Sequence, residues 1–242
     1  MKIMEKLAAR NSDYFSNRPV TIACLGDSVT HGCFEIYPDG KGGIGVACRP
    51  DEAYPMMLYR ALANHFPYAA PAIINAGVSG DKSYGGLERL ERDVLSYKPD
   101  LVIVDFGLND SMNKDIESGL ETYDKSMRAI FEKVLSSGAQ CMLLTPNYMN
   151  RKVSPLLTEP LFISIAEEAA VVQNTGILTR YVETARKAAK DMNVPVADAY
   201  AVWQQLEKNG VDTDIHLSNY INHPTREMHE IFVQEIMRAL LV

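Results

Sequence analysis

The sequence predicts a three-layer α/β/α fold with a mostly parallel, flavodoxin-like, five-stranded central sheet. Short apolar runs alternate along the chain with longer amphipathic stretches, which is the pattern of strand–helix units in a parallel sheet. The runs are continuously apolar, as expected of strands that are buried on both faces. With 242 residues, 47% of them hydrophobic, the chain is long enough for one large core, and we expect a single domain over residues 1–242.

Each element follows from its periodicity. The predicted strands are the apolar runs Val20–Leu25, Ala72–Asn75, Leu101–Phe106, Gln140–Thr145 and Val194–Ala197. The predicted helices are stretches with apolar residues every three or four positions, namely Glu52–His65, Gly86–Tyr97, Leu120–Ser136, Ile177–Met192 and Pro224–Leu241. The segment 146–175 is the least regular, and we expect it to be a substrate wall, a lid, or an ordinary helix with a long entry loop. Ligand sites in such folds form at the carboxyl ends of the strands.

Charge and hydropathy exclude several classes of partner. The net charge is −7, from 31 acidic and 24 basic residues, which argues against a nucleic-acid partner. No segment approaches the roughly 20 apolar residues of a membrane span. The N-terminal stretch lacks the unbroken apolar core of a secretory signal, so we expect a cytoplasmic protein.

The cysteines and histidines predict no metal or cofactor. Cys24 and Cys141 lie in predicted strands, whereas Cys33 and Cys48 flank a glycine-rich loop, and no CxxC pair is present. We expect four reduced cysteines, with a Cys33–Cys48 bridge as the alternative. No histidine pair has metal-ligand spacing beside an acid, and no glycine-rich phosphate-binding motif occurs, so we predict neither a metal nor a nucleotide cofactor.

Ser28 is the candidate nucleophile. It ends a Gly-Asp-Ser turn directly after the first predicted strand, where a helix would begin. The unpaired backbone N–H groups of a helix start stabilise an anion, so a serine here could attack a carbonyl and use its own N–H as an oxyanion donor. The alternative is a serine that caps the helix.

Two further turns carry candidate oxyanion donors. The segment Asn75–Asp81 follows the second strand and contains Gly80, whose backbone can approach a ligand closely. Asn109 follows the third strand and has a side-chain N–H to donate. Taken singly, the first segment is more typical of a surface turn, and the alternative for Asn109 is an Asx turn.

His223 is the candidate base. It precedes Pro224, which suits the first position of a helix. A histidine at a helix N-terminus is held neutral by the helix dipole, as a general base must be. The alternative is a capping or packing histidine.

Taken together, the four motifs resemble the SGNH (GDSL-like) hydrolase family over Gly26 to Pro224. The resemblance implies a serine esterase that works through an acyl-enzyme, with Ser28 as nucleophile and His223 as base. It also implies an oxyanion hole made of the backbone N–H groups of Ser28 and Gly80 and the side chain of Asn109.

One position departs from the family pattern. The family usually has an aspartate three residues before the histidine, and here that residue is Tyr220; a related spacing falls on Asn219. We expect an uncharged group, the Asn219 amide or the Tyr220 carbonyl, to orient His223. Asp212 and Asp214 are the alternatives.

The substrate is predicted from polarity near the site. We expect Asp27, His31, Asn147 and Tyr148 to contact substrate, and polar and aromatic surroundings suit a sugar better than a long acyl chain. The prediction is therefore an esterase that removes short acyl groups, chiefly acetyl, from a carbohydrate or similar polar ester. The alternatives are a lysophospholipase or thioesterase, a non-catalytic binding module, and a flavodoxin-like nucleotide binder.

Overall fold

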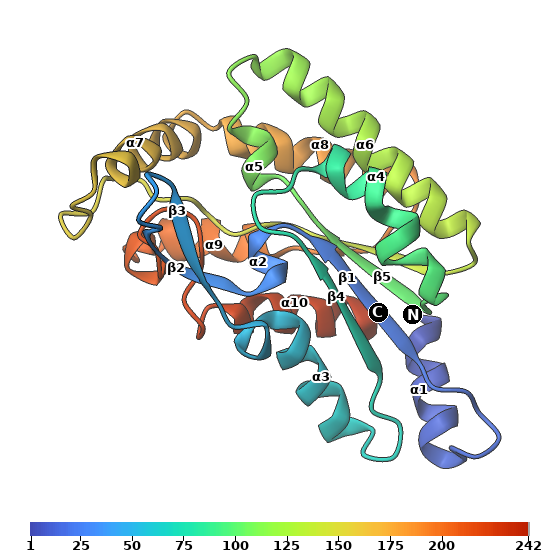
Figure 1. The fold of residues 1–242 in the computed structure, drawn as a ribbon. Helices are drawn as coiled ribbons and strands as arrows, with labels where there is room; N and C mark the ends of the chain where they lie inside the picture. Colours follow the sequence, from blue (N-terminus) through green and yellow to red (C-terminus); the bar gives the residue numbers. More distant parts are fainter. Residues whose placement is uncertain (242) are drawn as a thin grey trace.

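The computed structural model describes residues 1–241 and is built on a five-stranded, all-parallel sheet (Figure 1). Its order is β4-β1-β5-β6-β7, and the strands are β1 (Thr21–Gly26), β4 (Ala72–Gly77), β5 (Leu101–Asp105), β6 (Gln140–Leu144) and β7 (Val196–Ala197). All five predicted apolar runs contribute strands to this sheet. Of these, β1, β5 and β6 are buried along nearly their whole length, as expected of strands covered on both faces. The predicted fold class is confirmed.

Helices cover both faces of the sheet, which gives the three layers (Figure 1). One face carries α4 (Ser83–Asp93), α6 (Ile116–Ser136) and α8 (Ile177–Asp191), which pack in that order. The other face carries α1 (Lys2–Ser12), α3 (Tyr54–His65), α9 (Ala199–Lys208) and α10 (His229–Leu241), with α10 in contact with the other three. The two faces bury separate clusters of apolar side chains, so the sheet lies in the middle of the core.

The last helix begins later than predicted. We expected it to start at Pro224, but α10 starts at His229, and Pro224 instead forms a β-bridge with Leu217. Around this bridge the Ser218 N–H donates to the His223 carbonyl at 2.8 Å, and the Thr225 N–H donates to the His216 carbonyl at 2.8 Å. These bonds satisfy the backbone without a helix, so His223 lies in a loop.

Several elements were not predicted. They are α1, α9, the one-turn helix α5 (Leu108–Ser111), and a hairpin of β2 (Cys33–Pro38) and β3 (Ile44–Cys48). The helix that we expected to begin at Ser28 is present as the one-turn α2 (Ser28–His31). Short 3₁₀ turns occur at Pro50–Glu52, Leu95–Tyr97 and Thr213–His216. The irregular segment 146–175 consists of a loop followed by α7 (Pro160–Asn174). In Figure 1 the hairpin and α7 lie near each other, beyond the end of the sheet where α2 and α5 follow their strands.

No single helix within residues 1–241 is long and apolar enough to cross a membrane, although the bent pair α7 and α8 together meets the length and composition criteria.

We predict that the middle of β5 is a point of high stability. Ile103 is fully buried in this central strand, so Ile103→Ala should lower the free energy of unfolding by about 2–5 kcal/mol. Ile215 is 67% exposed, and Ile215→Ala should change it by less than about 0.5 kcal/mol. Urea unfolding of both variants measures the difference, and equal midpoints would contradict the assignment of β5 to the core.

Candidate active site

The carboxyl ends of three neighbouring strands meet at one point. In the sheet register, Gly26 of β1 is paired with Gly77 of β4 and with Asp105 of β5. The residues that follow these strands therefore converge, as the parallel topology requires. This register brings the Ser28, Gly80 and Asn109 segments together from three separate parts of the chain.

Ser28 is the first residue of α2, as expected from the sequence. Asp27 caps this helix, and its Oδ1 accepts a hydrogen bond of 2.9 Å from the Val29 N–H. The turn also requires Gly26, because a Cβ at that position would lie 2.1 Å from the Thr30 hydroxyl. The Gly-Asp-Ser motif is thus a tight strand-to-helix connection that presents the serine.

His223 reaches Ser28 across the fold. Its Nε2 lies 3.0 Å from the Ser28 Oγ, and its Nδ1 lies 2.8 Å from the backbone carbonyl of Phe34 in β2. A carbonyl only accepts hydrogen bonds, so Nδ1 carries the proton and Nε2 is left free to accept one from the serine hydroxyl. This is the tautomer that a general base needs.

The group that orients His223 is not the one expected. Asn219 uses its Oδ1 to accept the backbone N–H groups of Ile221, Asn222 and His223, at 3.0, 2.9 and 2.9 Å. It holds the loop that carries the histidine but makes no hydrogen bond to the ring. The prediction that the Asn219 amide orients the imidazole is therefore wrong, and the Phe34 carbonyl takes that place.

The other expected orienting groups also lie elsewhere. Asp212 pairs with Lys152 at 2.8 Å, and Asp214 accepts the Arg151 and Lys152 backbone N–H groups at 2.9 and 3.1 Å. Tyr220 has a positive φ of 61° and lines a neighbouring hollow. Among the described residues, the hydrogen-bond partners of the His223 ring are Phe34 and Ser28 alone.

Arg226 holds the β2–β3 hairpin against the loop that carries His223, residues 217–228, which we call the histidine loop. Its guanidinium carbon lies 4.3 Å from the centre of the Phe34 ring. The same guanidinium pairs with Glu35 at 2.5 Å and with Glu52. Sequence reasoning missed this contact set, since nothing in the motif around His223 indicates which strand will lie against it.

Burial keeps His223 neutral. The side chain is almost inaccessible, and desolvation lowers its pKa from 6.5 to about 4, although the Phe34 carbonyl and the charge of Glu35 act in the opposite direction. The expected result, a neutral base, is thus reached by a different cause. The helix dipole plays no part, because α10 begins six residues later.

Ser28, Gly80, Asn109 and His223 line a common cavity of about 290 Å³. Gly80 has a φ of +80°, a conformation that favours glycine. The Asn109 Nδ2 donates to the Asp81 carbonyl at 2.9 Å and lies 3.4 Å from the Asp27 Oδ2. The side-chain amide is therefore held at the cavity wall by the turns that follow β1 and β4.

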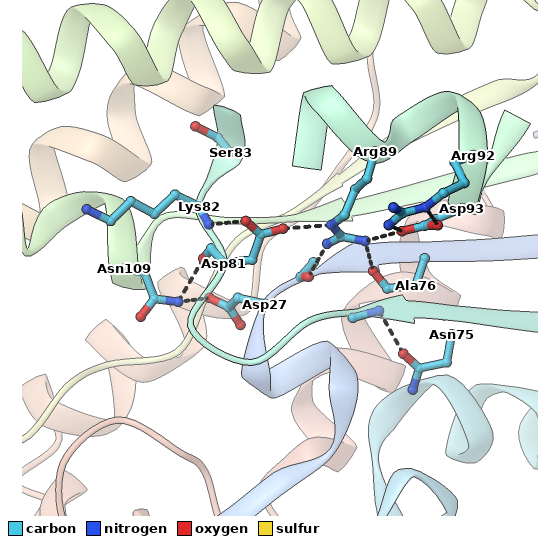
Figure 2. A network of polar contacts seen from close by, with 12 residues as sticks. Asp27, Asn75, Ala76, Asp81, Lys82, Ser83, Arg89, Arg92, Asp93 and Asn109 are labelled. Atoms are coloured by element: carbon cyan, nitrogen blue, oxygen red, sulfur yellow. Dashed lines mark hydrogen bonds and ion pairs between the residues drawn. The ribbon is translucent and has the colours of Figure 1, made fainter. Parts of the chain in front are cut away.

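Arg89 of α4 ties these turns to the sheet (Figure 2). Its guanidinium donates to the Gly26 carbonyl at 2.9 Å and to the Ala76 carbonyl at 2.6 Å, and pairs with Asp81 at 2.7 Å. Figure 2 shows Asp81 between Arg89 and Asn109, so one buried cation is linked to both strand ends and to the turn that holds the amide.

Two buried carboxyl groups support the same turns. Desolvation raises the pKa of Asp27 to about 7 and that of Asp110 to about 6. Asp110 accepts hydrogen bonds from the Ser83 hydroxyl at 2.6 Å and from its N–H at 3.1 Å, which fixes the start of α4. Asp27 is buried beneath the serine, where it caps α2 rather than facing the cavity.

The other predicted substrate contacts do not line this cavity. Asn147 and Tyr148 are buried; the Asn147 amide donates to the Asn222 carbonyl at 2.8 Å, and the Tyr148 hydroxyl donates to Glu207 at 2.9 Å. They support the histidine loop and the core, so the structure places them outside substrate reach. His31 lies instead beside Cys33 and Cys48, the group within residues 1–241 whose spacing suits a metal ion.

Comparison with protein families identifies the relationship. The model of the GDSL-like lipase/acylhydrolase family matches residues 24–231. The chain belongs to this family. The match includes all four motifs and the residues that line the cavity.

Similar proteins agree with this family. An acetylxylan esterase of Geobacillus stearothermophilus is 28% identical over 132 residues, 52% of this chain and 58% of that protein. The esterase TesA of Pseudomonas aeruginosa is 33% identical over 104 residues, 41% of this chain and 50% of that protein. The matches thus span about half the length of these curated relatives. The lipase/acylhydrolase structure from Enterococcus faecalis shares the fold, with a TM-score of 0.65, 23% identity, and coverage of 90% of this chain and 94% of that chain.

We predict that Arg89 and Arg92, neighbours on α4, differ sharply in their contribution to stability. Arg89→Ala removes the buried cation that the Gly26 and Ala76 carbonyls and Asp81 share, and should cost about 3–5 kcal/mol in the free energy of unfolding. Arg92 is 76% exposed and pairs only with Asp93, so Arg92→Ala is the matched control and should cost less than about 1 kcal/mol. Urea denaturation checks both, and a similar cost for the two variants would contradict the importance of the buried network.

Proposed function

We propose that this protein is a serine carboxylic ester hydrolase that removes short acyl groups, chiefly acetyl, from a carbohydrate or similar polar alcohol. The contact that carries the proposal is Ser28 Oγ to His223 Nε2 at 3.0 Å, with the imidazole proton fixed on Nδ1 by the Phe34 carbonyl. A non-catalytic binding module has no need for this tautomer and alignment.

The proposed mechanism follows from this alignment. His223 takes the proton from Ser28 as its oxygen attacks the ester carbonyl, and the imidazolium then protonates the leaving alcohol. The negative charge on the tetrahedral intermediate is stabilised by the N–H groups of Ser28 and Gly80 and by the Asn109 amide. His223 next activates water, which releases the acid from the acyl-enzyme.

The group that orients His223 is uncharged, which affects the stability of the imidazolium that forms during the proposed reaction. A carbonyl dipole stabilises the imidazolium less than a carboxylate does, because it carries only partial charge. Glu35 offsets part of this loss, since its charge favours the protonated form of His223. We therefore propose a working Ser28–His223 dyad held by a backbone acceptor.

The size of the cavity favours a substrate with a small acyl group. Its volume of about 290 Å³ is at the lower end for ligand sites. Its apolar walls come from the hairpin, α7 and the histidine loop, namely Ile36, Ile44, Val46, Ile165 and Ile221. α7 thus contributes a wall; its motion as a lid stays a hypothesis.

The lining of an adjoining hollow favours a polar alcohol as the other part of the substrate. It has about 330 Å³ and shares Ile36 and Asn219 with the first cavity. Its other lining residues include Tyr37, Tyr220 and Glu159. Aromatic faces beside carboxylates and hydroxyls suit a sugar ring, and the acetylxylan esterase relative supports the same substrate class. Lysophospholipase or thioesterase activity is the second candidate, favoured only by the apolar walls of the first cavity.

We predict that Ser28→Ala abolishes hydrolysis of p-nitrophenyl acetate. Loss of the nucleophile should lower kcat by about 10⁴-fold or more. The control is Ser96→Ala, an exposed serine whose hydroxyl donates to the Arg92 carbonyl, and it should keep wild-type kcat. Equal activity of wild type and Ser28→Ala would overturn the proposed nucleophile.

A chain-length and alcohol series tests the substrate class. The purified wild type is compared on acetyl, butyryl and lauroyl p-nitrophenyl esters, and on acetylated xylo-oligosaccharides against a lysophospholipid. The proposal expects kcat/KM to fall as the acyl chain lengthens and expects deacetylation of the oligosaccharide. Preference for the lauroyl ester or the lysophospholipid would replace it with the second candidate.

We predict an acid limb of kcat/KM near pH 4 instead of near 6.5. Burial lowers the pKa of His223 to about 4, so the base stays neutral and active as the pH falls until it is protonated around that value. The profile is measured for wild type and Asp27→Asn, because Asp27 has a pKa of about 7. A limb near 7 that disappears in Asp27→Asn would assign it to that carboxyl group and contradict the assignment to His223.

A further inference from the structure

The base of the β2–β3 hairpin brings together three metal-ligating side chains that lie outside the proposed dyad. His31 ends α2, Cys33 opens β2, and Cys48 ends β3. One ligand atom from each lies within 4.8 Å of the other two. The antiparallel register pairs Cys33 directly with Cys48, so the hairpin closes this cluster.

The backbone around the cluster is fixed. Gly32, between the histidine and the first cysteine, has a φ of +92°, and a Cβ there would lie 2.7 Å from the Pro50 Cα. Its carbonyl accepts a hydrogen bond of 2.7 Å from the Arg49 N–H. The chain segments that carry His31, Cys33 and Cys48 are therefore held against each other by main-chain contacts.

The donor set is that of a soft divalent cation. Zinc is bound by thiolate sulfur and imidazole nitrogen in a tetrahedron, with three protein ligands and a fourth open position in non-structural sites. At a Zn–S distance of about 2.3 Å, two sulfurs of one tetrahedron lie about 3.7 Å apart. The two sulfurs here are 3.0 Å apart, and Cys48 is exposed, so a small rotation of its side chain opens the site to an ion from solvent.

An unpartnered atom points to a ligand at the same place. The Nδ1 of His31 is buried and has no hydrogen-bond partner within residues 1–241. Leaving a buried polar nitrogen unpaired costs about 1–3 kcal/mol. The same imidazole ring has a nitrogen within 4.8 Å of both thiol sulfurs, so the unpartnered atom belongs to the cluster of possible ligands.

We propose that His31, Cys33 and Cys48 bind one soft divalent cation of the Zn²⁺ type. Two thiolates would neutralise the charge of the ion, and the neutral imidazole would supply the third ligand. Binding itself does not depend on the proposed esterase activity.

The site lies between the two halves of the proposed catalytic machinery. The side chain of Ser79, which precedes Gly80 in the chain, lies close enough to the Cys33 thiol to offset part of the rise in pKa that burial causes. Phe34, the next residue after Cys33, holds the His223 ring. An ion on Cys33 would therefore stiffen the hairpin whose Phe34 carbonyl orients His223. It would also replace the thiol proton of Cys33 next to the turn that holds Gly80.

The test is a metal titration of fully reduced, chelator-washed protein. Zn²⁺ is followed by calorimetry, and Co²⁺ by the near-ultraviolet sulfur-to-metal absorption that only thiolate ligation produces. The proposal expects one equivalent of each ion and a rise in Tm on saturation with Zn²⁺. Cys48→Ser should weaken binding by more than about tenfold, a loss that even outer-shell changes produce. Cys141→Ala, which removes a buried cysteine of β6 far from the hairpin, is the control and should bind as wild type.

Three results would overturn the proposal. They are no binding by reduced wild type, a Co²⁺ spectrum without the sulfur band, and equal affinity in Cys48→Ser. Thiol counting before and after reduction identifies the competing state: two thiols fewer before reduction, with no ion bound after it, would make Cys33–Cys48 a disulfide. Hydrolysis of p-nitrophenyl acetate by ion-free wild type separates the tests, because it reports on the esterase proposal whether or not the protein binds the metal.

Discussion

The hydrogen bond between the His223 ring and the Phe34 carbonyl is the contact on which the candidate site depends. It decides the tautomer of the imidazole and thereby leaves Nε2 to face Ser28. It exists only because the hairpin lies against the histidine loop, where Arg226 joins Phe34, Glu35 and Glu52. The hairpin is thus part of the candidate site, because it supplies the acceptor that orients His223.

A second buried network holds the opposite side of the cavity. Arg89 satisfies carbonyls at the ends of β1 and β4 and pairs with Asp81, whose own carbonyl holds the Asn109 amide. A buried guanidinium with fixed partners is expensive to disturb, so the turns after the strands are rigid. The proposed nucleophile and oxyanion donors therefore belong to the sheet, and the base and its orienting group belong to the loops packed beside it.

The hairpin also connects these two networks. Cys33 lies close to Ser79 on the oxyanion side, and the neighbouring Phe34 contacts His223 on the side of the base. The exposed Cys48 closes the hairpin at the same level. A ligand at this position would act on both sides of the cavity without entering it, because the connection runs through adjacent residues of one strand.

The sequence by itself determined the strands and their parallel orientation, which follow from local periodicity. The convergence of the segments after these strands follows from the rule that parallel strands end at one edge. The choice of Ser28, Gly80 and Asn109 within them came from the resemblance of their motifs to the SGNH (GDSL-like) family. Tertiary structure alone decided the partner of His223, which lies 189 residues away in the chain. Every residue has a backbone carbonyl, so no motif marks the one that will accept this bond. For the same reason the predictions for Asn219, Asn147 and Tyr148 failed: their residue types suited a site, but the packing of the loops gave each amide and hydroxyl a hydrogen-bond partner elsewhere in the protein.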